Sequence, residues 1–246
     1  MASTVGLGAK PLLRGLLTSP DTADELPAQD TSIQGSIAGR VADRVAELPE
    51  RSFVAIRDVD GSLSAVESAF SRLAAAGDVL RIRKYLYWKG ATTELGMSPP
   101  RVEEVALELG GPGAGPAGVA AAHWLGLTSQ VPSTLLAAVP GRAPSPCPGV
   151  RFTQRPIDRL LRSLTSAEVA VLEVLRAGPA VVEIPWEELP DVIAGLAASG
   201  SVRLDVLDEA AATEPHRQAR ARWSEIRAHP TLTHSSRRYT NEAILL

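Results

Sequence analysis

Residues 62–90 read SLSAVESAFSRLAAAGDVLRIRKYLYWKG, and this stretch decides how the first part of the chain folds. Its first half predicts an amphipathic helix, because Val66, Phe70 and Leu73 recur at spacings that place them on one face. Gly77 then stands where a residue in the left-handed conformation commonly ends a helix. The face opposite the apolar stripe carries Ser64, Ser68, Ser71 and, at its edge, Arg72.

After Gly77 the sequence changes to a pattern typical of β-strands. Residues 79–89, VLRIRKYLYWK, are rich in β-branched and aromatic side chains that nearly alternate with polar ones. Four of these eleven residues are basic and none is acidic. An exposed hairpin that carries only positive charge is well suited to contact phosphate. The basic residues of this ribbon are Arg81, Arg83, Lys84 and Lys89.

The residues before this helix complete the same unit. Residues 36–48, SIAGRVADRVAEL, predict a first helix that Ser36 begins and Pro49 ends. Residues 52–56 predict a short strand, and residues 57–61 predict a brief second helix with a turn. Helix, strand, short helix, helix and basic ribbon follow one another in a winged helix-turn-helix. In that fold the last helix enters the major groove, and the ribbon, called the wing, lies against the DNA backbone.

This pattern predicts two kinds of DNA contact. Small serine side chains allow a helix to approach base edges closely, and the cations of the ribbon can reach phosphate groups. The alternative interpretation is that the serines form an ordinary solvated face of the helix. The DNA-binding residues that we predict are Ser64, Ser68, Ser71, Arg72, Arg81, Arg83, Lys84 and Lys89.

The remainder of the chain predicts a second domain that is mixed α/β and mainly helical, so the expected fold class is α+β. A polar, Pro-rich stretch that ends at Pro99 and Pro100 marks the boundary between the two domains. We predict four parts: a flexible N-terminal arm (residues 1–35), a winged-helix DNA-binding domain (36–98), a C-terminal domain (99–228) and a tail (229–246).

Periodicity within the second domain predicts strands at three places. Residues 133–139 and 149–153 flank a Pro-rich loop, and residues 202–207 (VRLDVL) alternate as a strand does. The helices are expected at residues 101–110, 118–127, 165–177, 186–198 and 214–229.

Composition excludes several classes of protein. The chain has 246 residues and a formal net charge of −3, so the whole protein is not a general nucleic-acid coat. Cys147 is the only cysteine, which excludes an intramolecular disulfide and a thiolate zinc cluster. The sequence has no apolar run of 18 residues and no signal-peptide pattern, so we expect a cytoplasmic protein. The abundance of Ala, Arg, Gly and Pro suggests a bacterial source with a GC-rich genome.

No catalytic motif stands out in the sequence. Gly113, Gly115 and Gly118 match G-x-G-x-x-G, but a helical pattern precedes them and prolines interrupt them, which argues against a dinucleotide site. The four histidines show no metal-ligand spacing with carboxylates. We therefore expect no enzyme activity, no cofactor and no metal ion.

The chain resembles the AbiEi-type antitoxins, the abortive-infection antitoxins of bacterial type IV toxin–antitoxin systems. The similarity runs from about residue 36 to about residue 228, and the winged-helix part is the less specific portion. The matching segments are SAVESAFSRLAAAGDVLRI (64–82), RKYLYWKG (83–90), GVAAAHWLGLTSQVP (118–132) and TSAEVAVLEVLRAG (165–178).

The resemblance implies a repressor that binds inverted repeats in the operator of its own operon. It also implies a C-terminal domain that counteracts a nucleotidyltransferase-like toxin. Family wings often carry glycine where this chain has Tyr85, so the tip of this hairpin departs from the family pattern. The alternative function is a protein-interaction module without sequence-specific DNA binding, and the sequence leaves the oligomeric state open.

Overall fold

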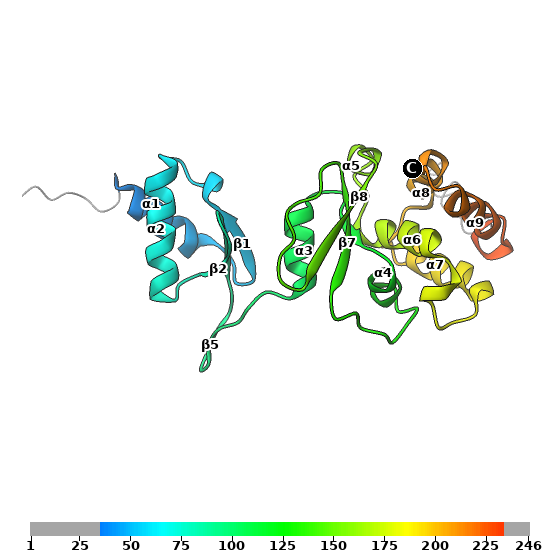
Figure 1. Ribbon diagram of the computed structural model, residues 1–246, viewed down its shortest axis with the longest axis horizontal. Coiled ribbons are helices and arrows are strands. Elements are labelled where there is room, and N and C mark those ends of the chain that lie inside the picture. Colours follow the sequence, from blue (N-terminus) through cyan, green and yellow to red (C-terminus); the bar gives the residue numbers. More distant parts are fainter. Residues whose placement is uncertain (1–34, 234–246) are drawn as a thin grey trace, which may run out of the picture.

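The computed structural model describes residues 35–233, and within them the fold is α+β (Figure 1). An N-terminal unit with a three-stranded sheet is followed by a second part with its own sheet and most of the helices. Most of the predicted arm (residues 1–35) and of the predicted tail (229–246) lies outside the described residues. None of the described helices has the length and apolar character that a bilayer crossing demands.

The N-terminal unit packs two helices against an antiparallel sheet with the strand order β1-β3-β2. The order of elements is the one that the sequence predicts. They are α1 (Ile37–Glu47), β1 (Ser52–Ala55), the short 3-10 helix η2 (Ile56–Asp58), α2 (Leu63–Ala76), β2 (Leu80–Arg83) and β3 (Leu86–Lys89).

Local interactions set the ends of the two main helices. The Ser36 hydroxyl accepts a hydrogen bond of 3.0 Å from the Gly39 amide and so begins α1. Gly77 ends α2 with φ at 88°, a left-handed conformation that glycine adopts without a steric cost. Both boundaries agree with the sequence-based prediction.

The core of the N-terminal unit joins both helices to the sheet. Val41 and Val45 from α1 and Val66 from α2 are almost completely buried. The rings of Phe70 and Tyr87 stack with their centroids 4.7 Å apart, which holds α2 against β3. Burial of this stripe leaves the opposite face of α2 in solvent.

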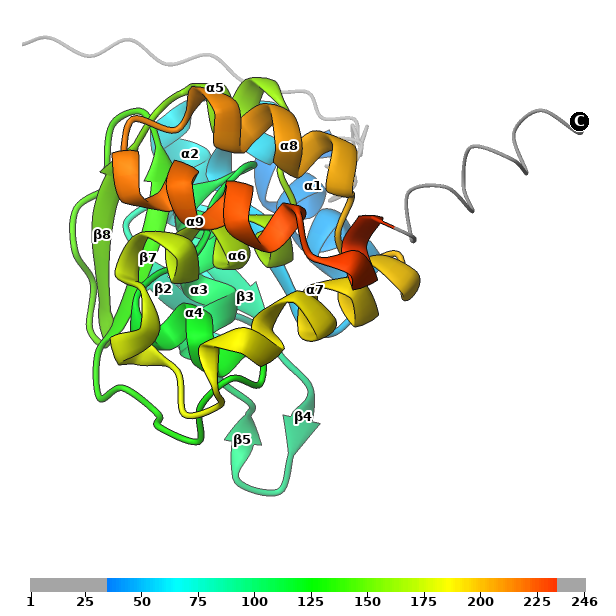
Figure 2. The ribbon, with the colours of Figure 1, turned by 90° about the vertical axis from the view of Figure 1, so that its right-hand side faces the viewer.

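A small hairpin projects from the segment between the two parts (Figures 1 and 2). It consists of β4 (Thr92–Thr93) and β5 (Gly96–Met97), and Leu95 at its tip is fully exposed. An ion pair of 2.6 Å between Arg51 and Glu104 connects the N-terminal unit directly to α3 (Val102–Gly110).

The second part is built on a mixed sheet with the strand order β6-β7-β8. Helix α3 lies on the side of this sheet that faces the N-terminal unit, and α6 to α9 lie on the other side (Figure 1). The remaining elements are β6 (Gly115–Pro116), α4 (Val119–Trp124), β7 (Leu135–Pro140), β8 (Val150–Arg155), α5 (Asp158–Leu161), α6 (Ser166–Ala177), η3 (Pro179–Val181), η4 (Trp186–Glu188), α7 (Leu189–Ala198), α8 (Leu204–Thr213) and α9 (Arg217–Arg227).

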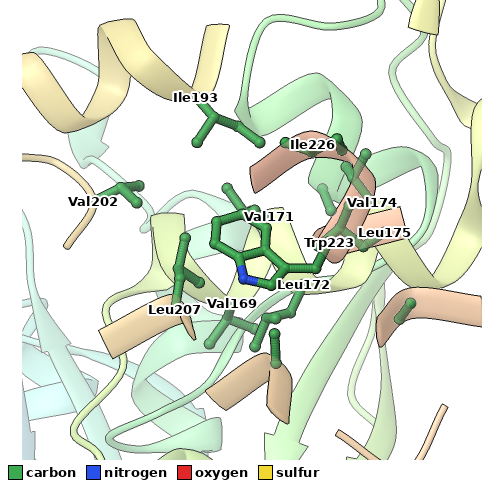
Figure 3. Packing of buried hydrophobic residues seen from close by; sticks show 14 of the residues in the cluster. Val169, Val171, Leu172, Val174, Leu175, Ile193, Val202, Leu207, Trp223 and Ile226 are labelled. Carbon is green, nitrogen blue, oxygen red and sulfur yellow. The ribbon is translucent and has the colours of Figure 1, made fainter. Parts of the chain in front are cut away.

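Helix α6 is the centre of the second core, because side chains on almost all of its faces are buried. Trp223 of α9 packs against it beside Leu172 and Leu175 (Figure 3). The indole Nε1 of Trp223 donates a hydrogen bond of 2.9 Å to Asp208, so its one polar atom is satisfied.

Two strand predictions for the second part are confirmed and one is wrong. β7 and β8 fall within two residues of the predicted ends, and they pair in parallel. Residues 202–207, predicted as a strand, instead lead into α8. Leu204, Leu207 and Ala211 lie on one helical face, and the buried positions Leu207 and Ala211 favour the helix over the strand that local alternation predicted.

Candidate nucleic-acid interface

The outer face of α2 is polar, small and exposed. Its four predicted DNA contacts, Ser64, Ser68, Ser71 and Arg72, are all exposed to solvent. The Ser68 hydroxyl donates a hydrogen bond of 2.8 Å to the Ser64 carbonyl oxygen, one turn earlier in the same helix. The serines therefore form a low surface that allows another molecule to approach the helix backbone closely.

Strands β2 and β3 form the hairpin that the sequence predicts as the wing. Leu86, Tyr87 and Trp88 of β3 are buried, which fixes this strand in the core. This burial holds the hairpin in place. Side chains alternate along β2, so Arg81 and Arg83 lie on the same face, and both are exposed. The structure thus brings the predicted wing cations together on one ribbon.

The turn between these strands is formed by Lys84 and Tyr85. Tyr85 has φ at 71°, a left-handed conformation that glycine adopts more readily. Its ring packs against the core of the N-terminal unit, and its carbonyl oxygen accepts a hydrogen bond of 3.1 Å from the Ile56 amide. The Lys84 ammonium lies 4.6 Å from the centroid of the Tyr85 ring. These contacts explain how a tyrosine occupies a position that favours glycine.

The ammonium of Lys84 stays charged over the whole physiological range. A hydrogen bond to the Tyr85 side chain raises the pKa of Lys84 above its usual value. Lys84 is therefore a permanent cation at the tip of the hairpin.

Lys89 is placed differently from the other predicted contacts. Its ammonium donates hydrogen bonds to the carbonyl oxygens of Val45 (2.7 Å), Ala46 (3.0 Å) and Leu48 (2.6 Å). These carbonyl groups lie at the C-terminal end of α1, where a cation interacts favourably with the helix dipole. All three donors of the ammonium are used within the fold, so we expect Lys89 to stabilise the protein rather than to contact DNA.

Replacing Lys89 with methionine is expected to destabilise the protein by about 1.5–3 kcal/mol, because three carbonyl groups lose a charged donor. The affinity of the folded variant for DNA should stay within about twofold of the parent's. Urea unfolding followed by circular dichroism measures the first effect, and fluorescence anisotropy with labelled DNA measures the second. The matched variant Lys84→Met should keep the stability of the parent and lose affinity for DNA. Equal losses of affinity in both variants would return Lys89 to the interface.

Sequence reasoning missed one cation of this surface. Arg57 of η2 has a side chain that is 84% exposed, and its Nε lies 3.8 Å from a carboxylate oxygen of Asp58. Arg57 lines the same cavity as Arg83 and Lys84. The residue begins the segment RDVDG and is followed by Asp58 and Asp60, so the sequence shows no local excess of positive charge there.

The described residues offer no grouping for metal chemistry. Within residues 35–233, no three His, Cys, Asp or Glu side chains come close enough together to hold a metal ion. Burial raises the pKa of the Cys147 thiol, although the charge of Arg83 acts in the opposite direction. A thiol with a raised pKa is a poor nucleophile at neutral pH.

Comparisons with known proteins leave the family of this chain open. No family model matches the sequence, and no curated protein matches it. Among solved structures, the chain is similar to the crystal structure of the RV2827C protein from Mycobacterium tuberculosis, at 16% sequence identity and a TM-score of 0.41. The similarity covers 80% of this chain and 76% of that one. A likeness at this TM-score supports no inference about this chain.

Proposed function

We propose that the N-terminal unit is a winged helix-turn-helix that binds duplex DNA, with α2 in the major groove and the β2–β3 ribbon as the wing. One observation carries this proposal. Among residues 35–233, no carboxylate lies within ion-pair distance of Arg81, Arg83 or Lys84, although all three are exposed. Unpaired cations on a rigid ribbon beside a small polar helix face are suited to phosphate and base contacts respectively.

The distribution of charge supports local rather than general binding. The whole chain has a net charge of −3, so attraction to DNA has to come from a particular surface. Each wing cation that neutralises a phosphate releases a condensed counterion, which makes binding steeply dependent on salt. The exposed serines and Arg72 would then read the bases that the wing brings into reach.

We further propose that the protein represses its own operon by binding operator inverted repeats, and that its second part counteracts a nucleotidyltransferase-like toxin. The support is the resemblance to AbiEi-type antitoxins. In the most discriminating segment of that resemblance, residues 118–132, Trp124 is 42% exposed and Val131 is 72% exposed. Exposed large apolar side chains are suited to a protein partner.

Fluorescence anisotropy tests the repressor proposal most directly. The protein is titrated into labelled DNA from the region upstream of its own gene, and into a scrambled duplex, over a series of salt concentrations. We expect tighter binding to the upstream duplex and a steep salt dependence. Equal, weak binding to both duplexes would contradict the repressor proposal and favour the protein-interaction alternative.

Replacing Arg81 with alanine is expected to weaken binding to both duplexes alike. Removal of one phosphate contact should reduce the slope of log affinity against log salt by about one. The matched control is Arg217→Ala, which removes an exposed arginine from the start of α9, at the far end of the molecule from the wing (Figure 1). If both variants keep the parent's slope, Arg81 is not a phosphate contact.

A further inference from the structure

A groove separates the tip of the wing from α3, and both parts of the protein line it. Its volume is about 470 Å³. The N-terminal unit contributes Arg57 from η2 and the wing-tip residues Arg83 and Lys84. The second part contributes Glu108 and Gly111, at the C-terminal end of α3.

The two walls of this groove carry opposite charge. Asp58, the acidic residue beside Arg57, already accepts a hydrogen bond of 2.8 Å from the Ala55 amide and lies 3.8 Å from the guanidinium. Asp58 therefore offsets part of the Arg57 charge, and Arg83 and Lys84 leave this wall with a net positive charge. On the other wall, the exposed Glu108 adds its charge to the partial negative charge at the C-terminal end of α3.

The groove is continuous with the proposed DNA-reading surface. Leu63, the first residue of α2, also lines it and is 56% exposed. Ser64 follows directly on the outer face of the same helix. A duplex bound at the Ser64 end of this face would then bring one strand of its backbone toward the groove.

We propose that this groove receives the phosphate backbone of bound DNA, with Arg57 as a further phosphate contact and Glu108 as an opposing charge. This inference rests on the proposed DNA-binding function and extends it to the second part of the protein. Helix α3 then limits the affinity, because its carboxylate repels the same phosphates that Arg57 attracts. Such repulsion between exposed charges weakens as salt rises.

Two substitutions with opposite expected effects test the proposal. Arg57→Ala should weaken binding to the upstream duplex roughly three- to tenfold and reduce the salt slope by about one. Glu108→Gln should strengthen binding roughly two- to fivefold at low salt, and the gain should disappear at high salt. Fluorescence anisotropy at several salt concentrations measures both effects. The matched control for Glu108 is Glu225→Gln, at an exposed position of α9 far from the groove.

The outcomes separate this inference from the function on which it rests. Opposite shifts in Arg57→Ala and Glu108→Gln, with no shift in Glu225→Gln, support the groove as a phosphate site. If Arg81→Ala weakens binding while both groove variants bind as the parent does, the groove proposal fails and the winged-helix function stands. If the parent protein binds no DNA, both fail. Thermal unfolding by circular dichroism should show the same midpoint for all these variants, which keeps a folding defect from imitating a binding defect.

Discussion

Replacing Ser68 with glutamate is expected to abolish specific binding to the upstream duplex, with a loss of affinity of roughly a hundredfold or more. Ser68 lies in the middle of the exposed face of α2, one turn after Ser64. A carboxylate there would face phosphate groups and the acceptor atoms of base edges. Unfavourable charge pairs at an interface cost several kcal/mol, and about 1.4 kcal/mol corresponds to a factor of ten in affinity.

The fold should tolerate this substitution. The Ser68 side chain is exposed, and within the described residues its hydroxyl bonds only to the Ser64 carbonyl oxygen of its own helix. Glutamate is a better helix former than serine, so the thermal midpoint by circular dichroism should change little. The control variant Ser68→Ala keeps the surface small and uncharged and should retain most of the affinity. Parent-like binding by Ser68→Glu in fluorescence anisotropy would show that α2 is not the element that reads DNA.

The sequence predicts the N-terminal unit well because its signals are local. The spacing of Val66, Phe70 and Leu73 predicts α2, and Gly77 marks its end. Near-alternation over residues 79–89 predicts the two strands of the hairpin. These elements depend on side chains a few residues apart, and the structure places them where periodicity does.

Contacts between segments that are far apart in the sequence could not be predicted from local patterns. The sequence predicts Lys89 as another cation of the wing. The carbonyl groups that bind it lie at the C-terminal end of α1, more than forty residues earlier. Arg57 reads as part of a mixed-charge turn, and only the fold places it beside Arg83. The wrong strand prediction at residues 202–207 has the same cause. A segment this short fits both the two-residue period of a strand and the 3.6-residue period of a helix, and packing with distant residues favours the helix.

A buried network of charges in the second part is the clearest case of this kind. Arg159 of α5 lies 2.7 Å from Glu173 and 3.0 Å from Glu214, and all three side chains are at most 3% exposed. Arg155 of β8 binds both carboxylate oxygens of Glu173 at 2.7 Å, and Arg176 pairs with Glu214. Three arginines thus share two carboxylates, and the network joins β8, α5, α6 and the segment before α9.

Replacing Glu173 with glutamine is expected to destabilise the protein by about 3–5 kcal/mol, because Arg159 would keep its charge in the interior and lose one of its two carboxylates. For a chain of this size, each kcal/mol lowers the thermal midpoint by roughly 2–4 °C. Urea unfolding and thermal unfolding by circular dichroism measure the loss. The control Glu225→Gln makes the same chemical change on an exposed position of α9 and should stay within about 0.5 kcal/mol of the parent.

A double variant separates the charge from simple loss of packing. Removing Arg159 together with the Glu173 carboxylate, as Arg159→Met with Glu173→Gln, eliminates the more deeply buried of the two arginine charges that lose Glu173 in the single variant. The double variant should therefore lose less stability than the sum of the two single variants. Strict additivity would mean that the two side chains contribute independently, and the network would then be no more than neighbouring contacts.

Acid should weaken the same network, because the pKa of Glu173 is lower in the folded protein than in the unfolded chain. Burial alone would raise this pKa, but hydrogen bonds from Arg155 and the charge of Arg159 outweigh burial and hold it below its usual value of about 4.3. The stability that the carboxylate contributes is fully present above the unfolded pKa, and it is lost as the pH falls through the lower folded pKa. Between about pH 5 and about pH 3 the parent should therefore lose more unfolding free energy than Glu173→Gln, which has no proton to gain there. Equal losses over this range, measured by urea unfolding at each pH, would assign the acid sensitivity to other carboxylates.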